Sequence, residues 1–271
     1  MTGALRPSSQ PEDLLADRYV TISVDDGDAG DMKTADLLHK YGLQATFYVP
    51  GRNPERPVIS PAQVRELSQR FEVGSHTLNH TPLKFLSDRK AEREITEGKQ
   101  WMEDVLGKPV HSFCYPRGKF NGTTPVLVEK AGFLGARTAQ MNLHECPRNR
   151  FLCGVSTLAY SLSKMIHVRH ALLERNFTGM RNFFGEYKGA TDWKEHFFHA
   201  LDYVETHGGI AHLMLHSWQF EELGDWHNLA SVFDSISQRR LVSVTNGDLF
   251  RRWSSSRLTA PALAEPVGRP R

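Results

Sequence analysis

Two histidines four residues apart, His76 and His80, are the residues best placed to do chemistry in this 271-residue chain. At that spacing they would lie on one side of a helical turn, close enough for both imidazoles to reach one metal ion. Two carboxylates, Asp25 and Asp26, stand upstream, and His216 ends an apolar stretch far downstream. One Asp and two His form a minimal open metal site, and the second Asp and the distant His are then left to move protons. This pattern indicates a metal-assisted hydrolase.

Each of these signals also has an ordinary structural explanation. An Asp-Asp-Gly sequence after a strand is often only a turn, because Asp and Gly suit turn geometry. Histidines fall four apart by chance, and a single histidine at the end of a strand is usually structural. The combination favours a site, because the three groups follow three predicted parallel strands whose carboxyl ends would bring them together.

Strands and helices alternate along most of the chain, with short connections. Predicted strands cover residues 19–24, 45–49, 71–73, 111–115, 133–137, 210–215 and 241–244. Predicted helices cover residues 31–41, 60–70, 87–106, 124–131, 163–177, 193–207 and 228–239. The alternation predicts an α/β fold with a parallel sheet and crossover helices. We expect a flexible arm over residues 1–17, a single domain over 18–253 and a disordered tail over 254–271.

The composition is that of a globular protein and excludes several classes. A formal net charge of +2 is too small to argue for nucleic acid or an anionic membrane surface as a partner. The N-terminus has no signal-peptide core and no run of ~18 apolar residues follows, so we expect no membrane span and a cytoplasmic location. Cys146 and Cys153 near His144 could bind zinc, but their spacing fits no standard zinc pattern. No feature of the sequence indicates an oligomeric state.

The predicted helix over residues 163–177 is rich in basic residues. Its polar side carries Lys164, His167, Arg169, His170 and Arg175. Helices normally turn charged residues outward, so a solvated face is the ordinary interpretation. A basic groove for an anionic substrate is the alternative.

Four segments of the chain resemble, in order and spacing, the successive motifs of the polysaccharide deacetylase family (carbohydrate esterase family 4). They are residues 23–27 (SVDDG), 75–80 (SHTLNH), 113–118 (FCYPRG) and 213–216 (LMLH). That family includes chitooligosaccharide and peptidoglycan N-deacetylases, and the similarity covers roughly residues 18–250. It implies a distorted (β/α) barrel of about seven parallel strands, in agreement with the alternation of elements.

The resemblance also implies a role for each motif residue. Asp26, His76 and His80 would hold one divalent metal, usually zinc in this family, although such a ligand set also accommodates Co²⁺, Ni²⁺, Mn²⁺ or Fe²⁺. Asp25 would be the general base that takes a proton from the attacking water. His216, as imidazolium, would protonate the departing amine, which leaves poorly without a proton.

The third motif would bind the substrate but departs from the family pattern. The backbone N–H of Tyr115 would stabilise the negative charge that develops on the attacked carbonyl. Many relatives have an Arg that pairs with the base; here Cys114 stands near that place, and Arg117 could substitute. Asp28 and Asp31 add negative charge beside the site, and they either select a substrate or begin the following helix, where Asp is favoured.

Two tryptophans are candidates for substrate contacts. Asp192-Trp193 could be a fourth motif, with Asp192 orienting His216 and Trp193 lining an acetyl pocket, or Trp193 could belong to the core. Trp218 stands beside the predicted acid and offers a face on which a sugar ring can stack.

We therefore expect hydrolysis of N-acetyl groups from a sugar or glycoconjugate, which gives a free amine and acetate. The expected partner is an N-acetylated saccharide, such as a soluble oligosaccharide, a nucleotide sugar or a lipid-linked sugar. One alternative is a C–N hydrolase that acts on a small non-sugar amide or ureide, because the same metal site can attack any accessible carbonyl. A second alternative is a non-catalytic glycan-binding module, which would have no need of Asp25 and His216.

Overall fold

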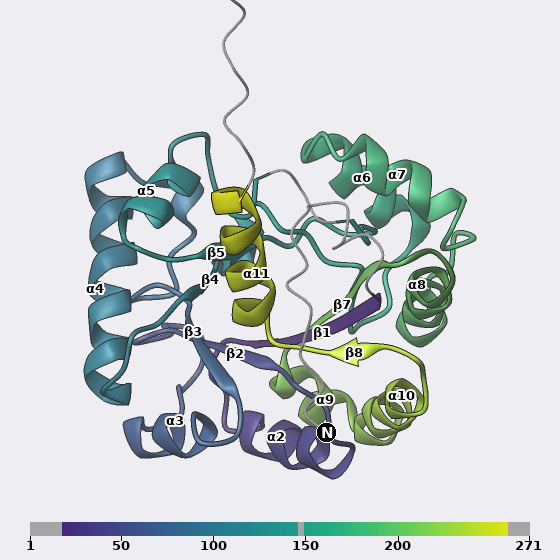
Figure 1. Cartoon of the computed structure of the whole chain (residues 1–271), viewed down its shortest axis with the longest axis horizontal. Coiled ribbons are helices and arrows are strands. Elements are labelled where there is room, and N and C mark those ends of the chain that lie inside the picture. The colour runs from purple at the N-terminus through teal and green to yellow at the C-terminus, as the bar shows by residue number, and fades with distance from the viewer. Residues whose placement is uncertain (1–17, 146–148, 260–271) are drawn as a thin grey trace, which may run out of the picture.

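Strand β1 (Arg18–Asp25) runs through the middle of a parallel sheet in the computed structural model, which describes residues 18–145 and 149–259, the last six by backbone alone (Figure 1). Its neighbours are β2 (Thr46–Val49) on one side and β7 (Gly209–Leu215) on the other. The sheet has the order β5-β4-β3-β2-β1-β7-β6, and β8 pairs with β1 off this path. The other strands are β3 (Glu72–Ser75), β4 (Ser112–Cys114), β5 (Gly135–Arg137), β6 (Thr157–Leu158) and β8 (Val242–Ser243).

The curled sheet closes through the segment that leads into β6. The Thr138 N–H donates to the Cys153 carbonyl oxygen at 2.8 Å, and the Cys153 N–H donates to the Ala136 carbonyl oxygen at 3.1 Å, so this segment pairs with β5. The Ser156 N–H then donates to the His212 carbonyl oxygen of β7 at 3.0 Å, and β6 continues this pairing. The prediction of a distorted (β/α) barrel of about seven parallel strands is confirmed.

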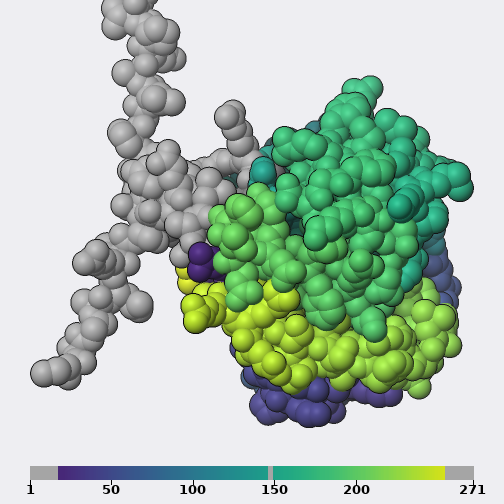
Figure 2. All heavy atoms as spheres, turned by 90° about the vertical axis from the view of Figure 1, so that its right-hand side faces the viewer, coloured from purple at the N-terminus to yellow at the C-terminus, as the bar shows by residue number. Residues whose placement is uncertain are grey.

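Helices cover the outside of the sheet (Figure 1). They are α2 (Asp31–Lys40), α3 (Pro61–Leu67), α4 (Asp88–Leu106), α5 (Thr124–Lys130), α6 (Lys164–Leu173), α7 (Phe177–Phe184), α8 (Trp193–His207), α9 (Ser217–Leu223), α10 (Trp226–Ser237) and α11 (Asn246–Thr259), with the short 3₁₀ helices η1 (Leu83–Phe85) and η2 (Pro116–Gly118). Figure 2 shows the flank that α6, α7 and α8 cover. Within the described residues, no helix is long and apolar enough to cross a membrane.

Local sequence signals set several of these boundaries, as predicted. The Ser60 side chain accepts a hydrogen bond from the Gln63 N–H, and the Gln63 side chain accepts one from the Ser60 N–H, so a capping box begins α3. Helix α4 ends at Gly107, which has a φ of 66°. Glycine adopts that left-handed conformation without the steric cost that other residues incur.

Two predicted boundaries are wrong. The single helix predicted over residues 163–177 is two helices, because Arg175 has a φ of 52°, which a right-handed helix does not contain. The predicted tail begins too early, since α11 continues through residue 254 to Thr259. The predicted arm over residues 1–17 and the remainder of the predicted tail lie outside the described residues.

The side chains of β1 alternate between the helices and the barrel interior, and this alternation places the first acidic residue. The valines and isoleucine of β1 belong to the main hydrophobic core. Thr21 and Ser23 face the interior instead, where their hydroxyl oxygens lie 2.6 and 3.0 Å from the two ring nitrogens of His212. Because side chains on one face of a strand recur every second residue, Asp25 also faces the interior, at the carboxyl end of the strand.

A buried arginine lies inside the barrel and was not foreseen from the sequence. The Arg137 guanidinium donates to Asn246 Oδ1 at 2.6 and 2.9 Å, to the Gly154 carbonyl oxygen at 2.8 Å and to Thr21 Oγ1 at 3.0 Å. Each of its nitrogens has a partner, as a buried cation requires. Asn246 begins α11, so the docking of this helix and the burial of the charge depend on each other.

Buried histidines form a stack on the flank of the barrel that α6, α7 and α8 cover. The His196 ring stacks on Tyr187, with centroids 4.2 Å apart, and lies 5.2 Å from the His167 ring. The His167 ring stacks in turn on Phe183 at 4.2 Å. Burial lowers the pKa of His196 to about 3 and that of His167 to about 4, so both rings are neutral at pH 7.

We expect this stack to make the fold acid-sensitive. A histidine in the unfolded chain titrates near pH 6.5. The two neutral rings therefore make their full contribution to the free energy of unfolding above that pH, and this contribution is lost as the pH falls from ~6.5 towards ~4. Each histidine should remove up to about 1.4 kcal/mol per pH unit over this range. Thermal unfolding of wild type between pH 7 and pH 4.5 measures the loss.

His167→Phe is the informative variant, because it keeps a ring between Phe183 and His196 but cannot bind a proton. Its melting temperature should fall less steeply with acid than that of wild type. His39→Gln, at an exposed position on α2, is the matched control and should follow wild type. If the melting temperature falls equally steeply with acid in wild type and in His167→Phe, the stack does not cause the acid sensitivity.

Candidate active site

The chain leaves β1 through a tight turn that contains Asp26. Asp26 has a φ of 83° and Gly27 a φ of 69°. The Asp26 N–H donates to the Tyr48 carbonyl oxygen of β2 at 3.1 Å, which fixes the turn against the sheet. A Cβ atom at Gly27 would lie 2.8 Å from a methyl group of Val49, so this turn requires glycine. The turn leaves the Asp26 carboxylate at the carboxyl end of the sheet.

The two histidines lie in a loop after β3 and not on a helical turn. Thr77 has a φ of 67° and His80 a φ of 54°, so the helical geometry expected from the spacing is wrong. The rings of His76 and His80 nevertheless come together, with centroids 5.0 Å apart. Helix α4 holds the loop in place, because the backbone and side-chain nitrogens of Asn79 donate to the Glu94 carboxylate at 2.9 and 2.7 Å.

The two imidazoles converge on Asp26. Its Oδ1 lies 3.0 Å from His80 Nε2 and 3.7 Å from His76 Nε2. His76 Nδ1 lies 2.8 Å from the carbonyl oxygen of Cys114, which can only accept a hydrogen bond, so Nδ1 carries the proton in the neutral ring and Nε2 presents its lone pair to Asp26. Burial raises the pKa of Asp26, but the imidazole rings of His76 and His80 beside its carboxylate outweigh this effect and hold its pKa below the usual range.

These residues fit a divalent metal ion. Asp26, His76 and His80 are buried and each offer one ligand atom, and these atoms lie within 4.8 Å of one another. An ionised carboxylate and an imidazole nitrogen with a free lone pair are the donors that Zn²⁺ and similar ions prefer. His80 Nδ1 has no hydrogen-bond partner among the described residues.

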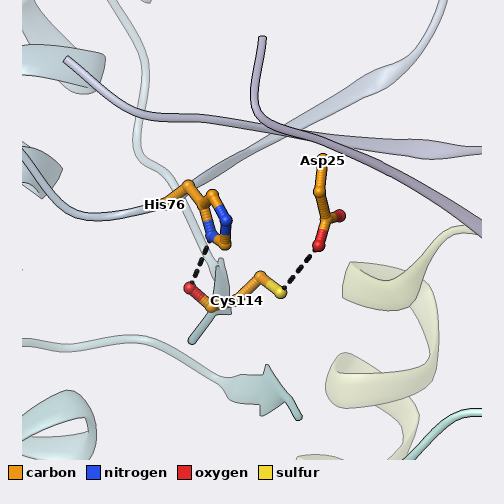
Figure 3. Close-up of side chains that lie close together, drawn as sticks. All are labelled: Asp25, His76 and Cys114. Atoms are coloured by element: carbon orange, nitrogen blue, oxygen red, sulfur yellow. Dashed lines mark hydrogen bonds between the residues drawn. The ribbon is translucent and has the colours of Figure 1, made fainter. Parts of the chain in front are cut away.

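Asp25 lies next to this cluster and is fully buried (Figure 3). Its Oδ2 accepts a hydrogen bond from the Cys114 thiol at 3.2 Å, while its Oδ1 has no partner among the described residues. Burial, followed by the charge of Asp26, raises the pKa of Asp25 to about 8. Asp25, His76 and Cys114 also offer three ligand atoms within 4.8 Å, so they are a second set able to hold a metal.

His216 approaches Asp26 from the other side of β1. Its Nε2 lies 3.9 Å from Asp26 Oδ2, and the same oxygen accepts a hydrogen bond from Trp218 Nε1 at 3.2 Å. Burial lowers the pKa of His216, and the charge of Asp26 and the Gln219 side chain act in the opposite direction. The Arg56 guanidinium lies 3.7 Å from the centre of the Trp218 ring, so Trp218 contacts both Asp26 and the loop that carries Arg56.

The predicted roles of Tyr115 and Arg117 are wrong. The Tyr115 N–H donates to the Arg137 carbonyl oxygen at 3.0 Å, and the residue is fully buried, so this N–H is not free to bind a substrate oxygen. The Arg117 side chain is half-exposed and pairs with Glu55, so it does not replace the missing partner of Asp25. The thiol of Cys114 takes that place.

Asp192 does not have the role predicted for it, and Trp193 follows the second of its two predicted alternatives. The Asp192 carboxylate accepts hydrogen bonds from the Lys194 and Glu195 N–H groups at 3.1 and 3.0 Å, so it caps α8 and does not orient His216. Trp193 is 5% exposed and belongs to the main core. Its surroundings therefore match the core alternative and not an acetyl pocket.

The remaining acidic and cysteine residues near these motifs have structural surroundings. Asp28 Oδ1 accepts a hydrogen bond from the Gly30 N–H at 2.8 Å, and Asp31 is fully buried as the first residue of α2, so both form the helix start. The Cys153 thiol donates to the Arg150 carbonyl oxygen at 3.2 Å. The predicted zinc alternative also needs Cys146, which lies outside the described residues.

Comparisons with known proteins agree with this architecture. Residues 14–136 match the sequence profile of the polysaccharide deacetylase family. The peptidoglycan-N-acetylglucosamine deacetylase of Bacillus cereus is 29% identical over 150 residues, which are 55% of this chain and 68% of that protein. The similarity to the polysaccharide deacetylase family lies in the N-terminal half of the chain.

Solved structures with the same fold extend the likeness to nearly the whole chain. A candidate polysaccharide deacetylase from Mycobacterium smegmatis is 15% identical with a TM-score of 0.60, and the alignment covers 97% of each chain. A family 4 carbohydrate esterase from Bacillus anthracis is 17% identical with a TM-score of 0.55, over 88% of this chain and 84% of that chain. At these identities the likeness shows the shared fold.

Proposed function

We propose that this protein is a metal-dependent hydrolase that removes N-acetyl groups from a saccharide or glycoconjugate and releases acetate. The observation that carries the proposal is the convergence of Asp26, His76 and His80 on one point, with Asp25 and His216 beside it. Three metal ligands with a separate acid and base are what amide hydrolysis needs. The similarity to the polysaccharide deacetylase family supports a sugar amide as the substrate.

Asp26, His76 and His80 would hold the metal, most simply Zn²⁺, since the set contains two imidazoles and a carboxylate. When bound, a divalent cation would polarise the amide carbonyl, acidify water and favour the ionised form of the neighbouring Asp25. The His76 Nδ1 contact with the Cys114 carbonyl oxygen keeps the ring in the tautomer and orientation that ligation requires.

Asp25 and His216 would move the two protons of the reaction. Asp25 Oδ1 has no hydrogen-bond partner among the described residues, so this oxygen can accept the proton of an attacking water. His216 lies on the other side of β1, and the charge of Asp26 at 3.9 Å stabilises its imidazolium form. In that form His216 can donate a proton to the amine as the C–N bond breaks.

The surroundings of the site favour a saccharide over a small amide or ureide. A groove with a cavity volume of about 750 Å³ borders the loop of His80, and Asn79, Thr81 and Trp101 contribute to its lining. This volume accommodates more than one sugar ring and exceeds what a small amide needs. The test is acetate release by metal-loaded protein from a panel of N-acetylated saccharides; an absence of release from every one would refute the proposal.

We expect the Cys114 thiol to position Asp25. Cys114→Ala removes the only hydrogen bond that the described residues give this carboxylate, so kcat should fall about tenfold, because small misplacements of a base are costly. Cys114→Ser keeps a donor and should recover most of the loss. Metal content, measured alongside kcat, should be unchanged in both variants. If Cys114→Ala turns over like wild type, the thiol does not position the base.

A further inference from the structure

Helix α6 turns apolar side chains outward and a histidine inward, which is the reverse of what a surface helix normally does. Met165 and Leu173 are 77% and 70% exposed, whereas His167 is buried and stacks on Phe183 of α7. A surface helix of a globular protein normally buries its apolar stripe against the core. The interpretation of residues 163–177 as a helix with a solvated polar face is therefore incomplete, because much of the exposed face of α6 is apolar.

The exposed apolar side chains are contiguous. Helix α6 lies at the periphery of the molecule (Figure 1), and the groove of about 470 Å³ along its outer face is lined by the apolar residues Met165, Val168, Leu172 and Leu173. Leu173 also lines a neighbouring groove of about 330 Å³, in which Phe85 of η1 is 76% exposed. Single exposed apolar side chains are ordinary, but a contiguous group of them marks an interaction surface.

Cations surround these apolar residues. Five of them line the two grooves, and they are Lys164 and Arg169 in the first and Lys84, Lys119 and Arg175 in the second. None of the five side chains forms a hydrogen bond or an ion pair with a described residue. Among the described residues, Glu174 is the one carboxylate that lines either groove. We call the five cations and the five apolar residues together the α6 patch.

The charge of the α6 patch indicates what kind of surface covers it. A two-fold contact between copies of this chain would place the patch against itself, so five cations of one copy would face five of the other and repel them. An anionic lipid surface complements both parts of the patch. Apolar side chains enter the boundary of the acyl chains, while Lys and Arg extend their long stems along that boundary and place their charges among the phosphate headgroups. Mobile headgroups also suit cations that have no fixed partner.

We propose that the α6 patch docks this protein on an anionic lipid surface, with α6 lying along the plane of the headgroups. Met165, Leu172 and Leu173 enter the apolar boundary, and the surrounding cations meet the lipid phosphates. The formal net charge of +2 averages over the whole chain and does not show this local excess, so the composition gave no reason to expect such a partner. The inference goes beyond the proposed function and does not depend on it, because docking needs no catalysis.

The experiment measures binding of the full chain to lipid vesicles by co-sedimentation. One set of vesicles is phosphatidylcholine alone, and the other contains equal parts of phosphatidylcholine and phosphatidylglycerol; soluble polyglutamate serves as an acidic polypeptide probe. Lys164→Gln removes a cation and Leu173→Ser an apolar side chain from the patch. Lys130→Gln, at the exposed end of α5, and Leu223→Ser, 73% exposed on α9, are the matched controls. The melting temperature of every variant is measured to verify its fold.

Wild type should bind the anionic vesicles much more tightly than the neutral ones, and added salt should release it, because salt screens exposed charges. Lys164→Gln and Leu173→Ser should each weaken binding about fivefold, as the loss of one cation or one apolar side chain at a lipid surface predicts. Both controls should bind as wild type does.

Three results would overturn the inference. The first is equal binding to both kinds of vesicle, or patch variants that bind as tightly as wild type. The second is binding to polyglutamate without binding to vesicles, which would assign the α6 patch to an acidic protein partner. The third is a concentration-dependent dimer that Leu173→Ser dissociates, without vesicle binding, which would make the patch a contact between copies of this chain.

Discussion

Asp25→Asn is expected to lower kcat for acetate release about a thousandfold while the bound metal is retained. The amide has the shape of the carboxylate and fits the same buried position, but it cannot accept a proton from water, and loss of a general base costs rates of this order. Because Asp25 is not one of the proposed ligands, metal content should stay at the wild-type level. Single-turnover rates on an N-acetylated tetrasaccharide, with metal analysis of the same sample, measure both quantities.

A second buried aspartate provides the matched control. Asp31 is also fully buried, and neither of its oxygens has a hydrogen-bond partner among the described residues. Burial raises the pKa of Asp31 well above its usual value. Asp31→Asn keeps the shape of this side chain and removes no group that the proposed reaction uses, so it should retain kcat within about twofold. Wild-type turnover by Asp25→Asn would show that another group is the base.

The parts of the fold that could be predicted from the sequence are those set by local signals. The capping box at Ser60 and the glycine at Gly107 mark helix ends through bonds between residues close in sequence. The break at Arg175 has a local signal as well, because the Asn176 side chain caps α7 by accepting a hydrogen bond from the Gly179 N–H at 2.8 Å. The prediction missed this break because the apolar pattern of a helix continues across it and a single Asn inside such a pattern does not by itself indicate a cap.

Part of the candidate site could also be predicted from the sequence. Asp25, Asp26 and His216 were expected to lie close together because each stands at the end of a parallel strand, and such strands end at one edge of a sheet. The Tyr115 N–H could not be judged from sequence, because its availability depends on how β4 pairs with β5.

Arg137 went unnoticed for a related reason. An arginine in a short strand ordinarily points to solvent, and only the closure of the barrel turns this side chain inward to Thr21 and Asn246. The sequence does not show that the strand closes the barrel, so it gives no sign that the charge is buried.

We expect the second large effect, a loss of metal affinity, when His80 is removed, and this experiment tells which residues hold the metal. His80→Ala leaves two of three ligands, so affinity for Zn²⁺ should fall at least about a hundredfold and acetate release should be lost with it. Metal content by mass spectrometry and Zn²⁺ titration by calorimetry measure this change. His39→Ala, an exposed histidine on α2, should bind metal as wild type does.

The comparison of His80→Ala with Cys114→Ala separates the two possible ligand sets. His80 belongs only to the set with Asp26, Cys114 belongs only to the set with Asp25, and His76 belongs to both, so a change at His76 alone is uninformative. Loss of metal in His80→Ala and its retention in Cys114→Ala assign the ion to Asp26, which leaves Asp25 free to act as a base. The opposite result would place the ion on Asp25 and the thiolate, and the protein would then lack the base on which the proposed hydrolysis depends.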